Sequence, residues 1–409
     1  MGGDCVLPQD LLIEILLWLP VISLLRFKTV CKLWRATIEG SDFIYRHATF
    51  ENSSDKIGNF IFQSRHRPFF YNFKPHFFSL SPSSSRGERE WVYKYIGVPP
   101  HLAEAEAEAE AEDLDQEELP FKVTLAGSCH GILCLHEVEP RDIILWNPAT
   151  KKFRRLPKSL PFLDETLRFC YDYVGFGFDI ETHDYKVFQS TTFQSDSDHL
   201  TETRVQVYSL HSNSRRWCTD LRTFPSYNHN KNQGRYLNGC FYLLGNNFYR
   251  KEVIENSKLW KYTDSEQVIL SFDFSKESFR MIPAPAPCLT WLYVIGGNHG
   301  KIVCLNYSHS GDIDTHQIYE LNATMIEENK EYSWSKLYTT TRDRCRSFNG
   351  PLEITRNGVF GFIDCFSNGR MMLFNLLTEE IFDIEINDTS LEGEFVIQTD
   401  VYRESLVSV

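Results

Sequence analysis

Apolar residues recur at helical spacing near the start of the chain. Four of them fall at i, i+3, i+4 and i+7 and predict one apolar helix face: Leu12, Ile15, Leu16 and Leu19. Pro8 suits the first turn of this helix, and Pro20 ends it. Similar spacing predicts two more short helices, over residues 21–28 and 30–38.

The remainder of the chain has the alternation and turn residues of β-hairpins. Four stretches share this pattern, each an apolar strand, a polar turn and a second strand: 143–157, 205–217, 268–283 and 372–386. Glycine-bounded strands lie between them: 127–135, 175–178, 238–244 and 300–305. Recurrence roughly every 50 to 65 residues is typical of blade-like units, close to the kelch period. We therefore expect a β-propeller-like, kelch-like domain, with a twisted β-sandwich as the alternative.

Composition supports two unequal parts. The chain has 409 residues, more than one small core usually supports, and its 14% aromatic content favours pleated sheets over helical bundles. Residues 104–118 hold nine acidic and no basic residues, which leaves −4 of the net charge of −13 for the rest. We expect a solvated, disordered insertion at about 100–120. The acidity favours a basic protein partner over nucleic acid.

Targeting and cysteine signals are few. The first residues lack the basic stretch of a secretory signal, and no apolar run approaches the roughly 20 residues of a spanning helix. We expect a cytoplasmic or nuclear protein without a membrane segment. Its 11 cysteines should be free thiols, and none stands in C-x-x-C spacing, which argues against a RING or zinc ribbon.

The first helices carry more apolar side chains than three short helices can enclose. Leu11, Leu17 and Trp18 broaden the apolar face beyond one stripe. The excess is covered either by the rest of the chain or by another protein, and composition alone favours the first.

The order and spacing of Leu7-Pro8, Glu14-Ile15-Leu16, Val30-Cys31-Lys32 and Trp34-Arg35 closely resemble the F-box. The resemblance implies docking to a Skp-type adaptor, and through it to a cullin and a RING subunit, so that this chain is a receptor and not an enzyme. We expect no cofactor and no metal. The residues expected to line or support the adaptor contact are Leu7, Pro8, Ile15, Leu16, Leu24, Val30, Cys31 and Trp34. Trp34 is equally well explained as an internal core residue.

The later motifs are similar to the plant F-box-associated domain, among them residues 127–135, 145–150, 175–179 with 184–187, and 207–210. Residues 402–408 look like the S-locus F-box branch of that family. The resemblance implies an F-box at 1–48 and a substrate-recognition domain at 49–409. It also implies a pollen protein that recognises non-self S-RNases, which tend to be basic, and directs them to ubiquitination and degradation. Another plant protein is the alternative target, and an enzyme or carbohydrate-binding propeller ranks last.

Other candidate sites each have a structural explanation. Cys129, His130, Cys134 and His136 suggest zinc, but strand parity would separate Cys129 from the others, so buried thiols are expected. Residues 296–302 echo a phosphate loop with the wrong spacing, and we interpret them as a turn entering a strand. The Phe-rich stretch 60–78 fits either a protein-binding surface or a pair of buried strands. The sequence assigns no individual substrate-binding residue, and the long polar, aromatic loops at 220–234 and 249–264 are the candidates for target contact.

Overall fold

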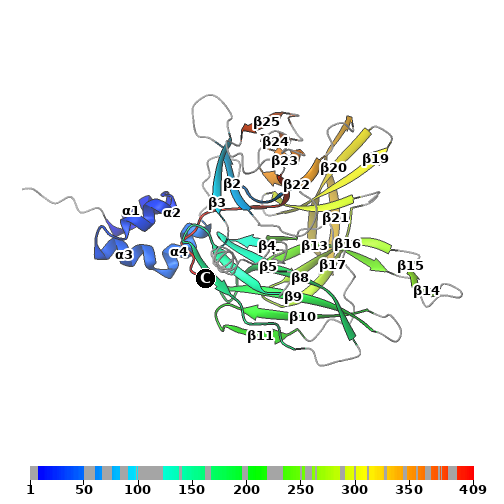
Figure 1. Cartoon of the computed structure of the whole chain (residues 1–409), viewed down its shortest axis with the longest axis horizontal. Helices are drawn as coiled ribbons and strands as arrows, with labels where there is room; N and C mark the ends of the chain where they lie inside the picture. Colours follow the sequence, from blue (N-terminus) through cyan, green and yellow to red (C-terminus); the bar gives the residue numbers. More distant parts are fainter. Residues whose placement is uncertain are drawn as a thin grey trace, which may run out of the picture.

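The computed structural model describes two parts, a helical module and a β domain (Figure 1). The described residues are 8–49, 60–66, 76–82, 91–97, 99, 123–137, 141–161, 167–195, 201–218, 234–248, 251–253, 260–262, 265–285, 291–298, 301–310, 313–326, 329–343, 348–355, 358–363, 370–375, 378, 380–385 and 394–409. The acidic segment 104–118 and Leu7 lie outside them.

The helical module consists of α1 (Gln9–Leu17), α2 (Val21–Phe27), α3 (Lys32–Glu39) and α4 (Ser41–Thr49). The three predicted helices are confirmed, with Pro8 and Pro20 at the N-caps of α1 and α2. The fourth was not predicted. Gly40 interrupts the pattern after α3, but the chain resumes a helix at once, because Phe43 and His47, one turn apart, are both buried.

The β domain contains six four-stranded antiparallel sheets among the described residues. Sheet 1 is β26 (Glu394–Val401), β1 (Phe60–His66), β2 (His76–Pro82) and β3 (Trp91–Gly97). Sheet 2 is β4 (Val123–Cys129), β5 (Ile132–Glu137), β6 (Ile143–Asn147) and β7 (Lys152–Arg155). Sheet 3 is β8 (Leu167–Asp179), β9 (Asp184–Ser195), β10 (Thr201–Ser209) and β11 (Ser214–Trp217).

The later sheets follow the same order along the chain. Sheet 4 is β12 (Arg235–Leu237), β13 (Cys240–Phe248), β16 (Ser265–Asp273) and β17 (Ser278–Pro283), and the short strands β14 (Lys251–Val253) and β15 (Trp260–Tyr262) pair with each other. Sheet 5 is β18 (Trp291–Asn298), β19 (Lys301–Ser310), β20 (Ile313–Ile326) and β21 (Asn329–Asp343). Sheet 6 is β22 (Phe348–Thr355), β23 (Gly358–Ile363), β24 (Arg370–Asn375) and β25 (Ile381–Glu385).

The strand named first in the description of each sheet contacts the strand named first in the next sheet. Contacts join β26 to β4, β4 to β8, β8 to β12, β12 to β18, β18 to β22, and β22 to β26. Sheet 1 itself joins the two ends of the β domain, because β26 pairs with β1. Side chains between neighbouring sheets form the buried core, with Phe188, Phe241 and Phe272 among the largest.

The four predicted hairpins are confirmed, and two of them, β6–β7 and β16–β17, share one type of turn with the β8–β9 hairpin. Four residues separate the paired strand ends in β6–β7, β8–β9 and β16–β17. In each, the last strand residue, Asn147, Asp179 or Asp273, accepts backbone N–H groups two and three residues ahead through its side-chain oxygen. The residue before the next strand has positive φ in all three. This side-chain-stabilised turn is why the repeated sequence pattern produces repeated hairpins.

Candidate functional site

The helical module has its own core. Its buried residues come from all four helices, together with one residue from the other end of the chain: Leu12, Leu16, Leu17, Val21, Leu24, Ile38, Phe43 and Leu406. Of the predicted adaptor-binding residues, Leu16 and Leu24 are fully buried in this core. These two can support a binding surface but cannot line it.

The same helices also carry large apolar side chains that are exposed outside this core. Six large side chains of α1–α3 and the turns between them are between 50% and 60% exposed: Leu11, Ile15, Trp18, Ile22, Val30 and Leu33. We call this set the apolar face. Each would gain on the order of 1 kcal/mol from complete burial. Among the described residues, exposed apolar groups of this size elsewhere are scattered over separate strands and turns. A patch of this kind is typical of a protein-binding surface.

Of the other predicted adaptor-binding residues, some lie at the surface and others help to hold the helices together. Ile15 and Val30 belong to the apolar face, and Pro8 and Cys31 are exposed beside it. The Cys31 Sγ also accepts the Trp34 backbone N–H at 3.5 Å and so caps α3. Trp34 is partly buried, with its ring edge-on to Phe27 at 5.2 Å. Leu7 lies outside the described residues.

The prediction that Ile15 shares a face with Leu12 and Leu16 was wrong. Leu12 and Leu16 point into the core, whereas Ile15 is exposed with Leu11 and Trp18 at i, i+4 and i+7. Four members of the apolar face were not singled out as binding residues from the sequence: Leu11, Trp18, Ile22 and Leu33. The second helical stripe in α1 is the signal that could have identified Leu11 and Trp18.

Helix α4 joins the helical module to the β domain, nearest to it in Figure 1. On one side Arg46 forms a 2.7 Å ion pair with Glu14 of α1. On the other, the Tyr45 ring stacks on Phe178 at 5.6 Å and lies edge-on to His130 and His183. Burial, together with the positive charge of Arg403, lowers the pKa of His130 to about 4, so this histidine is neutral at pH 7.

The final residues of the sequence form a second connection, which we call the tail segment (Tyr402–Val409). Leu406 enters the core of the helical module, while Val407 enters the core of sheets 2 and 3. The Asn147 Nδ2 donates to the Ser405 carbonyl at 3.0 Å and to the Val407 carbonyl at 2.7 Å. The tail segment therefore contacts both parts of the molecule, and the C-terminus lies beside α4 (Figure 1).

Replacing Gly131 by Ala is expected to lower the melting temperature more than replacing Gly239. Both glycines follow a residue of positive φ in a two-residue hairpin turn and have positive φ themselves, so each substitution costs about 1–2 kcal/mol. A Cβ on Gly131 would also lie 2.4 Å from the Arg403 carbonyl oxygen, whereas one on Gly239 meets only ordinary contacts. Thermal unfolding of the two variants checks this, and equal losses would contradict the close approach of the tail segment.

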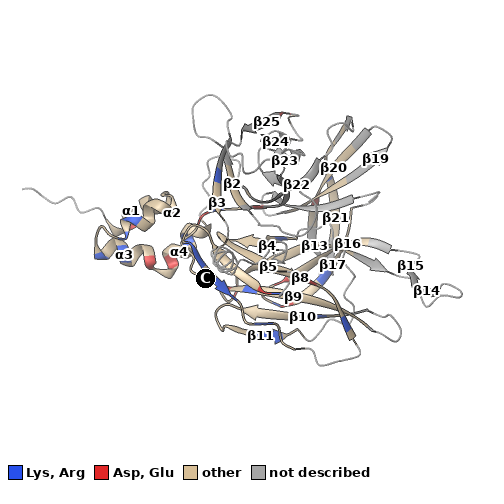
Figure 2. Ribbon diagram, viewed as in Figure 1, with Lys and Arg blue, Asp and Glu red and all other residues tan. Residues whose placement is uncertain are grey.

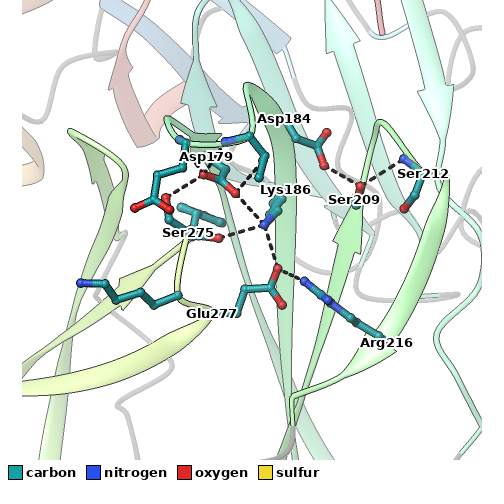
Figure 3. Close-up of polar contacts among 12 residues, drawn as sticks. Asp179, Asp184, Lys186, Ser209, Ser212, Arg216, Ser275 and Glu277 are labelled. Atoms are coloured by element: carbon teal, nitrogen blue, oxygen red, sulfur yellow. Dashed lines mark hydrogen bonds and ion pairs between the residues drawn. The ribbon is translucent and has the colours of Figure 1, made fainter.

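A buried polar network links sheets 3 and 4 (Figure 3). Lys186 Nζ donates to Asp179 Oδ2 at 2.7 Å, to Glu277 Oε1 at 2.8 Å and to the Phe274 carbonyl at 3.0 Å. Arg216 also donates to Glu277. Burial alone would raise the pKa of Asp179, but hydrogen bonds from Lys186 and from the hydroxyls of neighbouring residues outweigh it and hold that pKa well below its usual range.

A shallow cavity of about 260 Å³ lies beside this network, lined in part by Asp184, His211 and Ser212. Asp184 already accepts the Ser209 hydroxyl and, at 2.9 Å, the His211 backbone N–H. All three donors of Lys186 are also paired. These side chains are occupied in holding the turns together, so we assign the network to stability.

The structure corrects the reasoning about the cysteine and histidine cluster. Strand parity was expected to separate Cys129 from Cys134, but a two-residue turn at 130–131 reverses the chain between them. Cys129 pairs with Ile132 and both thiols enter the same core cluster. Burial raises the pKa of each thiol. Within the described ranges, no group of three or more His, Cys, Asp or Glu side chains is placed to hold a metal ion.

The remaining sequence candidates are partly visible. Phe77 and Phe78 are buried in β2, as the paired-strand interpretation predicted, and β1 pairs with β2. Lys301 begins β19, while residues 299 and 300 lie outside the described part. Most of the loops at 220–234 and 249–264 also lie outside it, apart from Gly234 and the β14–β15 pair. Among the described helices, none is both long and apolar enough to cross a bilayer.

Comparison with known proteins decides the family. The F-box domain profile matches residues 5–46, and the F-box-associated beta propeller domain profile matches residues 99–409. The chain belongs to the F-box-associated family. An F-box/kelch-repeat protein of Arabidopsis thaliana is 26% identical over 81% of this chain and 78% of that protein. Another Arabidopsis F-box/kelch-repeat protein is 26% identical over 81% of this chain and 71% of its own length.

A crystal structure of a protein from Lactobacillus plantarum aligns with 85% of this chain and 98% of that protein. The identity is 10% and the TM-score is 0.30, so this similarity supports no inference.

The family gives the F-box protein its general role. An F-box binds a Skp-type adaptor within SCF complexes, and F-box proteins with an F-box-associated domain generally act as substrate receptors. Such proteins are generally not catalytic themselves. The helical module, residues 8–49, corresponds to the matched F-box, and the apolar face lies within it.

Proposed function

We propose that this F-box protein is a non-catalytic substrate receptor that binds its Skp-type adaptor through the apolar face and presents a basic protein for ubiquitination. The observation that carries the proposal is the position of this face. Its six side chains stay half exposed although the helical module already has a complete core of its own. A bound protein would remove that surface from water.

The predicted adaptor residues take two roles in this proposal. Pro8, Ile15, Val30 and Cys31 lie at the surface and contact the adaptor, as Leu7 does in the family motif. Leu16, Leu24 and Trp34 hold the helices in the orientation that exposes them. Leu11, Trp18, Ile22 and Leu33 extend the contact.

For the β domain we propose a closed six-bladed propeller. The series of contacts between the first strands, which begins and ends at β26, supports a ring of sheets over a two-layer sandwich. Pairing of β26 with β1 would close that ring. We keep the division into an F-box at 1–48 and a substrate-recognition domain at 49–409.

For the target we propose a non-self S-RNase in pollen, encountered in the cytoplasm. Two observations support this choice, the similarity of residues 402–408 to the S-locus branch and the net charge of −13. Residues 104–118 carry nine acidic residues and would be the main source of long-range attraction for a basic target. The outer strand β11 carries basic residues and would not attract such a target (Figure 2). Another plant protein is the second candidate, favoured by the Arabidopsis F-box relatives.

Selective capture tests the target. The adaptor-bound protein, purified and immobilised, should retain some S-RNases from pistil extracts and not others. It should bind more weakly as salt rises from 50 to 300 mM, because charge attraction over about 10 Å is screened. Equal retention of all S-RNases would contradict specific recognition. Retention of a different plant protein instead would replace S-RNase as the target while leaving the receptor role intact.

A further inference from the structure

The tail segment does more than end the β domain. Leu406 is 6% exposed and belongs to the core of the helical module, together with buried residues of α1–α4. Its neighbours in the sequence belong to the other part of the molecule, because Val407 is buried in the core of sheets 2 and 3. One residue step therefore crosses from one hydrophobic core to the other.

Residues of the β domain hold the tail segment in place. Asn147, itself buried, uses its amide N–H groups on the carbonyls of residues 405 and 407, the two neighbours of Leu406. Gly131 leaves room for the Arg403 carbonyl, which a larger residue would displace. The Lys94–Glu404 ion pair adds a third, exposed contact at 3.1 Å. Leu406 is thus held in position by its flanking residues.

We propose that the tail segment is a positioning element, in which Leu406 completes the F-box core and fixes the orientation of the F-box on the β domain. The proposal rests on the proposed receptor function. A ubiquitin ligase transfers ubiquitin to lysines that reach the conjugating enzyme, so the angle between adaptor and substrate domain decides which lysines are modified. A fixed connection between the F-box and the β domain restricts the set of modified lysines, and a flexible connection enlarges it.

The test uses the full chain in a reconstituted complex with adaptor, cullin and RING subunit. Leu406→Ala removes the side chain that the tail segment places in the F-box core. Leu406→Met keeps an apolar side chain of similar size there and is the conservative control. Asn147→Asp opens the β side, because it keeps the turn-capping oxygen but turns the two N–H donors into an acceptor facing two carbonyls. Ser408→Ala changes an exposed neighbour and serves as the matched control.

Three measurements are made on each variant: adaptor affinity, hydrogen exchange of α1 and α2, and the map of lysines ubiquitinated on the receptor itself. Leu406→Ala should reduce exchange protection in α1 and α2 by about 100-fold, as large-to-small core changes do. It should also spread ubiquitin to lysines that the wild type leaves unmodified. Asn147→Asp should spread the map similarly, and Leu406→Met and Ser408→Ala should match the wild type.

Wild-type protection in Leu406→Ala would overturn the role of Leu406 in the F-box core. Lost protection with an unchanged lysine map would overturn the positioning role. Failure of the receptor function has a different signature: the wild-type chain would not bind adaptor at all, while the exchange difference between wild type and Leu406→Ala would persist in the free protein.

Discussion

The double variant Ile15→Asp, Val30→Asp is expected to bind the Skp-type adaptor at least about 100-fold more weakly than the wild type. Both side chains are at least half exposed in the free chain, so an interface that covers them must desolvate the new carboxylates. The melting temperature should change little, since neither residue belongs to the module core. Isothermal calorimetry and thermal unfolding measure the two effects separately.

Leu337→Asp provides the matched control. Leu337 in β21 is 47% exposed, close to the 50% of Ile15, but it lies on the β domain. The same chemical change there should leave adaptor affinity within about twofold of the wild type. Equal loss in both variants would mean that adaptor binding responds to surface charge in general, and the apolar face would lose its assigned role.

Replacing Lys186 by Met should destabilise the β domain by about 3–5 kcal/mol, because it leaves Asp179 buried without its cationic partner. Lys276→Met is the control, since Lys276 is exposed and pairs with Asp273 only at 3.8 Å, a contact worth about 0–1 kcal/mol. Denaturant unfolding at pH 7 should separate the two variants clearly. A similar small loss in both would show that the buried network contributes little to stability.

The difference between wild type and Lys186→Met should also depend on pH. The pKa of Asp179 is lowered in the folded wild type, so its contribution is present above the unfolded value near 4 and is lost as pH falls further. For Lys186, burial lowers the pKa, but the hydrogen bonds to Asp179 and Glu277 raise it above its usual value, so that contribution is lost only at strongly alkaline pH. Melting curves from pH 3 to 8 should show the gap narrowing below about pH 4. A constant gap would contradict the ion pair.

Local patterns in the sequence predicted much of the fold. Proline placement and apolar spacing located α1–α3, and alternation with polar turns identified the four hairpins. In two of these hairpins an Asn or Asp at the strand end stabilises its own turn. These are interactions between residues a few positions apart. Helix α4 was missed because Gly40 separates it from α3.

The joint between the two parts could not be predicted in this way. Asn147 bonds residues 258 and 260 positions later in the chain. The local sequence identifies Asn147 as a turn residue, and its side-chain oxygen fills that role. Nothing in the neighbouring sequence indicates that its side-chain N–H groups bind a distant segment. Leu406 likewise stands among strand-like residues, and only the folded chain brings it into a helical core. The prediction that Cys129 points away from Cys134 failed for a related reason, since alternation of side chains holds only within one strand and these two residues lie on different strands.

Hydrogen exchange of the full chain with and without its Skp-type adaptor tests the central claim most directly. The adaptor should slow exchange across α1, α2 and the start of α3, where the apolar face lies, and leave β10 and β11 unchanged. Protection confined to the β domain, with α1–α3 exchanging as fast as before, would contradict the account.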